Sequence, residues 1–535
     1  MSPSPSSEHP SHPSHGTPAA PAPESTSNSA AAAANTAAPA DSGPWVSRTH
    51  RRSVLLVLTV VATAILFDGY DLVVYGAVLP TLLDDPSQIG ALSPETAGTL
   101  GAWALIGVLV GALTAGAVGD RFGRKRVMLV ASVWFSAGMA LTALTTSTAA
   151  FGFFRFLAGV GVGMIVATGG AIIAEFAPRG RKNLFNAIVY SGIPAGGVMA
   201  SVLAILLLDA IGWRGLFLIG ASPLLFLVPL IIVALPESPR WLVSVGRTEE
   251  ALAVCDKHGL PMSDFIPSPS SLSDDSTAAT APNPGATNSG APGTGSPNAA
   301  ATAGDVETPA PAEKVGYAAL FSRKYAIGAL LIGFMSFTGL LLTYGLNTWL
   351  PKIMEGAGGQ ASGSLLFLVV LNGGAIVGGL AASWLADRIG AKRVVAGTFL
   401  IAALCLVALP MNLPLGVLYA AVAIAGFGTI GTQVLVYGLT ANYFDTEARA
   451  AGVAWCAGFG RIGGILGPVI GGLIIGAGLS SGSALYIFAG LALIGSVLTA
   501  MVQRSPAQEQ RVELLPTPER TGESTPDSTH ITAAN

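Results

Sequence analysis

Charged residues and cysteines are scarce in this sequence. Only 11% of its 535 residues are Asp, Glu, Lys or Arg, whereas a soluble domain typically has about 25%. This deficit argues against a water-soluble fold. The three cysteines, Cys255, Cys405 and Cys456, are too few and too scattered for a disulfide framework or a metal site. The net charge of -3 gives no indication of a nucleic-acid partner.

Features of secreted proteins and of enzymes are missing as well. A secretory signal has a short basic region directly before its apolar core, but here about fifty residues rich in Pro, Ser and Ala precede the first apolar run. No combination of a nucleophile with a base and no metal-binding cluster can be recognised. We therefore expect neither an enzyme nor a bound cofactor or metal ion.

Long apolar runs and glycines are abundant instead. The chain is 51% hydrophobic, with a mean hydropathy of +0.62, and it contains 67 glycines, which let membrane helices approach one another closely. An all-α polytopic membrane protein embedded in a lipid bilayer is therefore predicted. Runs long enough to cross a bilayer occur twelve times, at about 53–77, 95–118, 127–147, 150–175, 184–208, 214–235, 325–350, 362–386, 394–411, 414–441, 451–477 and 483–502.

Basic residues are distributed unevenly between the two sides that these spans define. Of the 27 Lys and Arg residues, 23 fall on one side, Arg214 and Lys352 fall on the other, and Arg155 and Arg461 lie inside spans. Cytoplasmic loops carry the excess of Lys and Arg in membrane proteins. Both termini are therefore expected in the cytoplasm, and the protein in the inner (cytoplasmic) membrane.

The twelve predicted spans form two sets of six. Residues 268–311 between the sets have few charges and the composition of a flexible linker. The loop at 119–127, after the second span, resembles the loop at 386–394, after the eighth, at an offset of 267 residues. Internal repeats of this kind are typical of transporters. We expect the following organisation: a disordered tail at 1–50, a six-helix half at 51–242, a largely disordered cytoplasmic linker at 243–320, a second six-helix half at 321–504 and a disordered tail at 505–535.

Two carboxylates, Asp68 and Asp71, lie inside the first span. A charged side chain there costs about 2.5–3.5 kcal/mol, so such residues usually have a function. Three residues apart, they share one face of a helix. Repulsion between two carboxylates in a poorly solvated place favours the uptake of a proton, which suits a proton-coupled protein. The alternative is that both simply line a wet vestibule at a helix end.

Two short motifs resemble known transporters. The sequence Asp120-Arg121-Phe122-Gly123-Arg124-Lys125, with a weaker copy at 386–394, resembles the loop signature of the major facilitator superfamily. Within that superfamily, Asp68-Gly69-Tyr70-Asp71 resembles the acidic signature of the aromatic acid:proton symporter family. Further segments in both halves are similar to that family, and the resemblance covers about residues 50–504. These segments are 155–159 with Glu175 later in the same span, 344–351, 447–455 and 460–464.

The resemblance implies the major facilitator fold, with twelve transmembrane helices in two six-helix halves. It implies a monomer that imports an aromatic carboxylate of the hydroxybenzoate or benzoate class by proton symport with alternating access. For proton coupling it points to Asp68, Asp71 and Glu175. For substrate binding we predict Arg461, Arg155, Tyr70, Asn347 and Trp455. A latch on the cytoplasmic side would contain Asp120, Arg121, Arg124, Asp387, Arg388 and Arg449.

Each of these roles has a simpler alternative. The planar guanidinium of Arg155 or Arg461 would match a substrate carboxylate, but either arginine could instead pair with a protein carboxylate, including Asp68 or Asp71. Glu175 could pair with a neighbouring arginine at its helix end, and the basic loops could serve topology alone. Other polar-tipped aromatic residues in the spans are expected to be packing residues, among them Tyr190, Tyr344 and Tyr437.

Other functions also remain open at this stage. Residues 236–242 resemble a motif of sugar porters, which keeps a sugar or polyol symporter, or another organic-acid symporter, as an alternative. A proton-antiport drug exporter should not need two buried arginines. A transporter-like membrane sensor is a remote alternative, because the tails and the linker show no folded-domain pattern. The common aromatic acids differ by one or two hydroxyls, which the spacing of residues does not distinguish.

Overall fold

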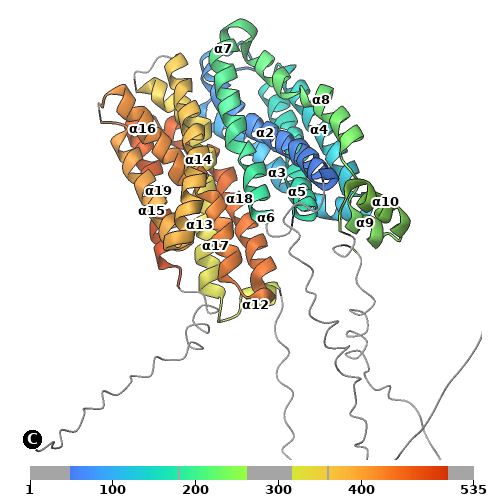
Figure 1. Cartoon of the computed structure of the whole chain (residues 1–535). Helices are drawn as coiled ribbons and strands as arrows, with labels where there is room; N and C mark the ends of the chain where they lie inside the picture. The colour runs from blue at the N-terminus through green and yellow to red at the C-terminus, as the bar shows by residue number, and fades with distance from the viewer. Residues whose placement is uncertain are drawn as a thin grey trace, which may run out of the picture.

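The computed structural model describes residues 48–178, 181–261, 265, 316–357, 361–411 and 413–503. The regular elements in these ranges are all helices, arranged as two bundles side by side (Figure 1). The predicted tails, apart from residues 48–50, and the low-complexity segment 268–311 lie outside the described residues. The first bundle contains α2 (Arg48–Asp84), α3 (Pro94–Phe122), α4 (Arg124–Ala143), α5 (Thr148–Phe176), α6 (Lys182–Tyr190), α7 (Gly192–Gly220) and α8 (Pro223–Ala234).

The second bundle follows after three short helices. These are α9 (Pro239–Ser244), α10 (Thr248–His258) and α12 (Tyr317–Leu320). The predicted linker, 243–320, thus begins with a helix, and α10 is attached to α2 because His258 Nδ1 lies 2.9 Å from Ser53 Oγ. The second bundle contains α13 (Ala326–Gly356), α14 (Ala361–Ile389), α15 (Ala391–Ala408), α16 (Leu415–Gly426), η2 (Phe427–Gly431), α17 (Gln433–Tyr443), α18 (Thr446–Gly476) and α19 (Ser481–Met501).

Eleven helical segments among the described residues are long and apolar enough to cross a membrane. One of them, Leu184–Ala234, has 51 residues; as a straight helix it would measure about 76 Å, far more than the ~30 Å of a bilayer core. Gly212 interrupts it with φ 66° and ψ 177°, a conformation that glycine adopts without the steric penalty of a Cβ. The segment therefore contains two spans, and the predicted twelve-span, all-α fold is confirmed.

The two ends of the bundles differ in charge. We call the end that carries α9, α10 and α12 the basic side (Figure 1), because Arg121, Arg124 and Arg388 lie at the helix ends there. The other end, called the opposite side, is where α2 and α13 finish. The Lys352 ammonium there lies 2.7 Å from the Asp84 carboxylate and joins these two helices.

Glycine allows close packing of the helices within each bundle and between the bundles. A Cβ at Gly111 of α3 would lie 2.0 Å from the main-chain oxygen of Val160 in α5, so a larger residue would force the helices apart. Between the bundles, a Cβ at Gly98 of α3 would lie 2.6 Å from Pro468 O in α18. This contact lies near the opposite side, because α3 starts there and α18 ends there.

The bundles part toward the basic side. Gly119 of α3 and Gly458 of α18 lie further toward the basic side than Gly98 and Pro468, and no described atom comes within 4 Å of a Cβ built on either. Helices α3 and α18 are thus in contact near the opposite side and leave space between them near the basic side. In this conformation the interface between the bundles is tightest on the opposite side.

Candidate functional site

The two carboxylates predicted in the first span have different surroundings. Asp71 of α2 forms an ion pair with Arg155 of α5, and the two side chains are only 6% and 3% exposed. Arg155 Nη1 also lies 3.4 Å from Asp71 O, and the guanidinium lies 5.2 Å from the ring centroid of Tyr75. A buried cation is thus neutralised by a carboxylate and placed over an aromatic ring. Arg155 was predicted either to bind the substrate carboxylate or to pair with a protein carboxylate. In the structure it pairs with Asp71.

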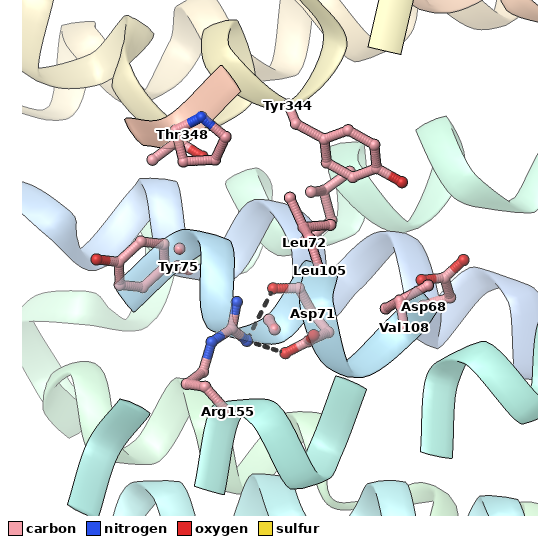
Figure 2. A pocket seen from close by; sticks show the side chains of 12 residues that line it. Asp68, Asp71, Leu72, Tyr75, Leu105, Val108, Arg155, Tyr344 and Thr348 are labelled. Carbon is pink, nitrogen blue, oxygen red and sulfur yellow. Dashed lines mark hydrogen bonds and ion pairs between the residues drawn. The ribbon is translucent and has the colours of Figure 1, made fainter. Parts of the chain in front are cut away.

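Asp68 lies one helical turn from this pair. Figure 2 shows Arg155 on the side of Asp71 that is remote from Asp68. Asp68 has no hydrogen bond or ion pair with another residue in the part of the chain that the structure describes. It lines a cavity together with Asp71 and Arg155 from the first bundle and Tyr344 and Thr348 from α13. The site therefore lies between the two bundles.

This cavity is small. Its volume is about 20 Å³, which is room for about one water molecule and not for an aromatic ring. Pro468 of α18 and Gly101 of α3 close it toward the opposite side, where a Cβ on Gly101 would lie 3.0 Å from the Pro468 side chain. A larger molecule could enter only if the bundles moved relative to one another.

Arg461 lies at the middle of α18, fifteen residues from either end. Its side chain is partly exposed although this position is about 22 Å from both ends of the helix, so it faces space inside the protein. The guanidinium is within electrostatic range of the Asp68 carboxylate. It forms no hydrogen bond or ion pair with a residue in the described ranges. The structure thus leaves this cation available to a ligand.

Three tyrosines gather near Arg461. The hydroxyls of Tyr190 in α6, Tyr344 in α13 and Tyr437 in α17 are all within electrostatic range of its guanidinium. Both bundles contribute to this group, which sequence reasoning assigned to packing. All three are aromatic residues with a polar tip inside spans, and this property could have marked them as candidates for the site. Their grouping depends on the rotation of three separate helices, so the sequence alone did not reveal it.

Two other predicted substrate residues have their polar groups engaged elsewhere. Tyr70 donates a hydrogen bond of 2.7 Å to Leu216 O inside the first bundle. Trp455 donates from Nε1 to Ala329 O at 2.8 Å and stacks on Phe459 at a centroid distance of 4.9 Å. The structure does not bring either of them to Arg461.

Asn347 is fully buried at the interface between the bundles. Its Nδ2 donates to Thr343 O at 2.8 Å, and its Oδ1 accepts from Asn372 Nδ2 at 2.9 Å. A Cβ at Gly76 of α2 would lie 2.0 Å from Asn347 O. In this conformation the residue therefore contributes to the contact between the bundles.

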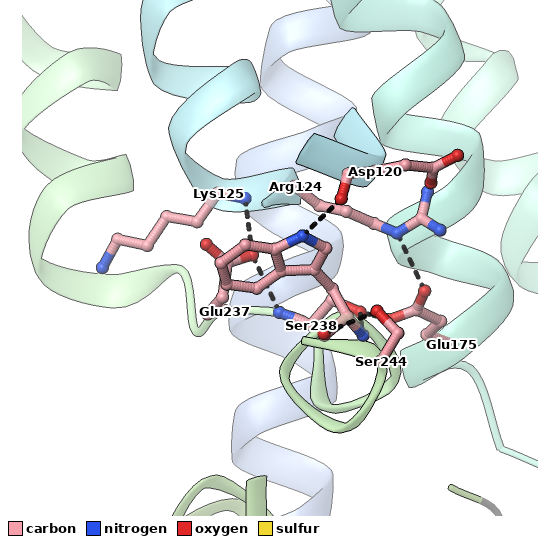
Figure 3. A network of polar contacts seen from close by, with 8 residues as sticks. Asp120, Arg124, Lys125, Glu175, Glu237, Ser238 and Ser244 are labelled. Atoms are coloured by element: carbon pink, nitrogen blue, oxygen red, sulfur yellow. Dashed lines mark hydrogen bonds and ion pairs between the residues drawn. The ribbon is translucent and has the colours of Figure 1, made fainter. Parts of the chain in front are cut away.

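Glu175 is brought together with the predicted latch residue Arg124 (Figure 3). It lies at the basic end of α5, where Arg124 Nε is 3.0 Å from its Oε1 and Ser238 Oγ donates to its Oε2 at 2.5 Å. Its side chain is 4% exposed. An ion pair with an arginine is thus present, and this partner comes from α4; Arg179, which follows α5, lies outside the described residues.

The junction of α3 and α4 is attached to α9 and to the segment before it. Glu237 Oε1 accepts a hydrogen bond of 3.0 Å from the main-chain N–H of Lys125, and Trp241 Nε1 donates to Asp120 O at 2.9 Å (Figure 3). Gly123, at φ 91°, fits against Glu237, because a Cβ there would lie 2.5 Å from the carboxylate. The motif at 236–242 therefore serves as a support for this junction.

The other predicted latch residues contact an aromatic ring or a main-chain oxygen, or are exposed. The Arg121 guanidinium lies 5.7 Å from the Phe122 ring centroid, and that of Arg388 lies 3.8 Å from the Trp384 ring centroid. Arg449 Nε donates to Phe444 O at 3.3 Å, and Asp387 is exposed. The second copy of the loop motif lacks the equivalent of the Glu237 contact in the described part of the chain.

A polar cluster outside the spans joins the starts of α13 and α18. Asp445 accepts hydrogen bonds from the Tyr325 hydroxyl and from Lys324 Nζ, the latter at 2.9 Å. These bonds lower the pKa of Asp445, and the bonds with Tyr325 and Asp445 raise the pKa of Lys324. Among the described residues, no group of three or more His, Cys, Asp or Glu side chains could hold a metal ion.

Comparison with known proteins adds independent information. The model of the Major Facilitator Superfamily matches residues 61–381 and 356–521. The benzoate transport protein of Acinetobacter baylyi is 33% identical over 77% of this chain and 81% of its own length. The gentisate transporter of Corynebacterium glutamicum is 30% identical over 82% and 85%, respectively. The 4-hydroxybenzoate transporter of Pseudomonas putida is 28% identical over 86% and 95%.

Solved structures show the same architecture. The partially occluded, inward-open xylose transporter XylE of E. coli superposes with a TM-score of 0.62, over 84% of this chain and 98% of that protein. The two sequences are 18% identical, so this likeness concerns the fold alone.

Proposed function

Because this chain belongs to the major facilitator superfamily and, within it, to the aromatic acid:proton symporter family, we propose that it imports an aromatic carboxylate together with protons. The substrate class is that of benzoate and the hydroxybenzoates, as the names of its relatives suggest. The basic side faces the cytoplasm, in keeping with the positive-inside rule. The protein then lies in the inner membrane with both termini inside.

One observation carries this proposal: the balance of charge at the centre of the membrane. Asp68, Asp71, Arg155 and Arg461 supply two negative and two positive charges. An entering carboxylate adds one negative charge, and an uncompensated charge in this setting is costly. One proton restores neutrality. The balance therefore favours the transport of one proton with each monoanionic substrate.

The contacts suggest a separate role for each charged residue. Arg155 already neutralises Asp71, so Asp68 is the better candidate for the proton. Arg461 is free to bind the substrate carboxylate, which its planar guanidinium can hold through two hydrogen bonds. The tyrosines near Arg461 offer aromatic faces and hydroxyls to the substrate ring.

In the proposed cycle, the two bundles move relative to one another so that the site opens to one side of the membrane at a time. Opening toward the outside requires separation of α3 from α18 and of Asp84 from Lys352, since these contacts close the opposite side. The substrate then binds near Arg461 after Asp68 has taken up a proton. Rocking of the bundles opens the basic side, and release of the proton frees the substrate. The supported loop around Arg124 and Glu175 serves as the latch on that side.

Uptake by whole cells tests this proposal. Cells that produce the protein should accumulate labelled benzoate or 4-hydroxybenzoate and lose this accumulation when a protonophore collapses the gradient. Asp68→Asn should abolish accumulation but retain exchange of labelled for unlabelled substrate, because the neutral amide imitates the protonated acid. Asp256→Asn, at an exposed position of α10, is the matched control and should behave like the wild type.

Two results would contradict the proposal. Accumulation that persists without a gradient would exclude proton coupling. Absence of uptake of any aromatic acid by a correctly inserted protein would exclude the substrate class. A sugar or polyol taken up in its place would favour the alternative suggested by residues 236–242.

A further inference from the structure

The tenth span is not a continuous α-helix. Between α16 and α17 it contains the π-helical turn η2, Phe427–Gly431. Turns of this kind are rare and occur frequently at functional sites, because the wider turn shifts the residues that follow. Neighbouring helices hold this turn closely. A Cβ on Gly426 would lie 1.9 Å from Leu371 O in α14, and one on Gly428 would lie 2.3 Å from Thr398 O in α15.

Gln433 is the first residue of α17, immediately after this distortion. Its side chain is only 8% exposed. The amide Nε2 donates to Ser336 Oγ at 3.3 Å, whereas Oε1 has no hydrogen-bond partner in the described part of the chain. Turning the amide over would exchange the two atoms and still leave one polar atom without a partner. A buried amide in this state is costly, so its retention calls for a function.

The amide lies against α13, where a Cβ on Gly339 would be 2.5 Å from its Oε1, and two of its neighbours connect it to Arg461. Ser336, its hydrogen-bond partner, packs against Gly460, where a Cβ would lie 2.3 Å from Ser336 Oγ, and Gly460 is adjacent to Arg461. Tyr437 follows Gln433 by one helical turn. Its hydroxyl is close to the Gln433 side chain and also within electrostatic range of Arg461. Gln433 and Arg461 thus approach the same tyrosine hydroxyl.

We propose that Gln433, together with Tyr437, recognises a ring hydroxyl of the transported aromatic acid. This inference rests on the proposed function and refines it: the preferred substrates are hydroxylated aromatic acids, with benzoate a poorer one. The carboxylate binds Arg461, and a hydroxyl on the ring donates a hydrogen bond to Gln433 Oε1. The Tyr437 hydroxyl is near both side chains. A site with a buried polar group disfavours a ligand that leaves this group unpaired.

Initial uptake rates of labelled benzoate, 3-hydroxybenzoate and 4-hydroxybenzoate, below saturation, test the inference in cells that produce the full-length protein. Gln433→Met keeps the length of the side chain and removes its polar atoms. It should lower the rate for at least one hydroxybenzoate relative to benzoate about tenfold, the contribution of one such hydrogen bond. Thr429→Val is the control. The Thr429 hydroxyl bonds to Ala425 O of its own span at 2.8 Å, and its loss should leave the ratio unchanged.

Each result is decisive. An equal loss for all three acids in Gln433→Met would indicate a packing role and overturn the inference, as would an unchanged ratio. If Gln433→Met does not reach the membrane, Tyr437→Phe provides the same test, because it removes one hydroxyl and should lower the same ratio. A wild-type protein that takes up benzoate and the hydroxybenzoates equally well would refute the inference and leave the proposed function intact. A wild type that takes up none of them would refute both.

Discussion

The buried ion pair between Asp71 and Arg155 allows the proposed balance of charge to be tested directly. Asp71→Asn and Arg155→Gln each remove one charge and leave its partner buried. The double variant removes both and leaves Asp68 and Arg461 to balance one another. Stability and coupling should therefore respond differently in the single and double variants.

The effect on stability follows from burial. The side chains of this pair are 3% and 6% exposed, and loss of one partner of such a pair costs about 3–5 kcal/mol because an unpaired charge remains in a poorly solvated place. Arg247 and Glu250 provide a matched exposed pair at 44% and 56%. Pairs of that kind contribute about 0.2–1 kcal/mol, so Arg247→Gln should have little effect.

Two assays separate the consequences. Thermal unfolding of the purified protein in detergent should show a large loss of stability in each single variant, with most of it recovered in the double variant. In uptake assays, Asp71→Asn leaves two arginines facing one carboxylate, so substrate should bind without a proton and accumulation should no longer follow the gradient. The double variant should recover gradient-driven accumulation, because Asp68 still takes up the proton.

The reasoning would be refuted by either of two results. One is a stability of Asp71→Asn no lower than that of Arg247→Gln. The other is a double variant whose loss of stability equals the sum of the losses in the single variants, because this would mean that the two charges do not compensate one another.

Two further predictions concern other parts of the molecule. Gly98→Leu should reduce transport more than tenfold at normal abundance, because its side chain would meet Pro468 O, 2.6 Å from the Cβ position, and prevent closure of the opposite side. Gly116→Leu, with no described atom within 4 Å, should transport normally. Asp445→Asn should lower the free energy of unfolding at pH 7 by about 1 kcal/mol or less. Since the pKa of Asp445 is lowered in the folded protein, its contribution is present above the ordinary carboxyl pKa of about 4 and lost on acidification below it. Thermal melts at pH 7 and at about pH 2 should therefore show a smaller acid-induced loss in Asp445→Asn than in the wild type, and an unchanged loss would contradict this assignment.

The positions of the charged residues along each span were predictable, but their partners were not. Spacing placed Asp68 and Asp71 on one face of α2, and both line the same cavity. The same rule argues against Tyr70 as a substrate residue. It is two residues from Asp68, and residues two apart on a helix do not face the same way. The sequence could not predict that Arg155 pairs with Asp71 and not with Asp68, since this depends on how α2 and α5 are rotated against one another.

Glu175 illustrates a second limit. Its place at a helix end suggested an arginine partner nearby in the sequence, and this reasoning could not point to Arg124, which reaches it from another helix. The motif at 236–242 resembled that of sugar porters, yet its observed contacts are with the loop around Asp120 and Lys125. A motif that supports a loop carries little information about substrate.

The sequence alone determined the twelve spans, the uneven distribution of basic residues and the presence of two carboxylates and two arginines within the membrane. These features are local, since each span must match the thickness of the bilayer and each buried charge stands out in an apolar run. The tertiary structure decided which charges pair, which tyrosines surround Arg461 and where the π-helical turn leaves Gln433 without a partner. Those features depend on how close-packed helices are rotated about their axes, and contacts between residues far apart in the chain set that rotation.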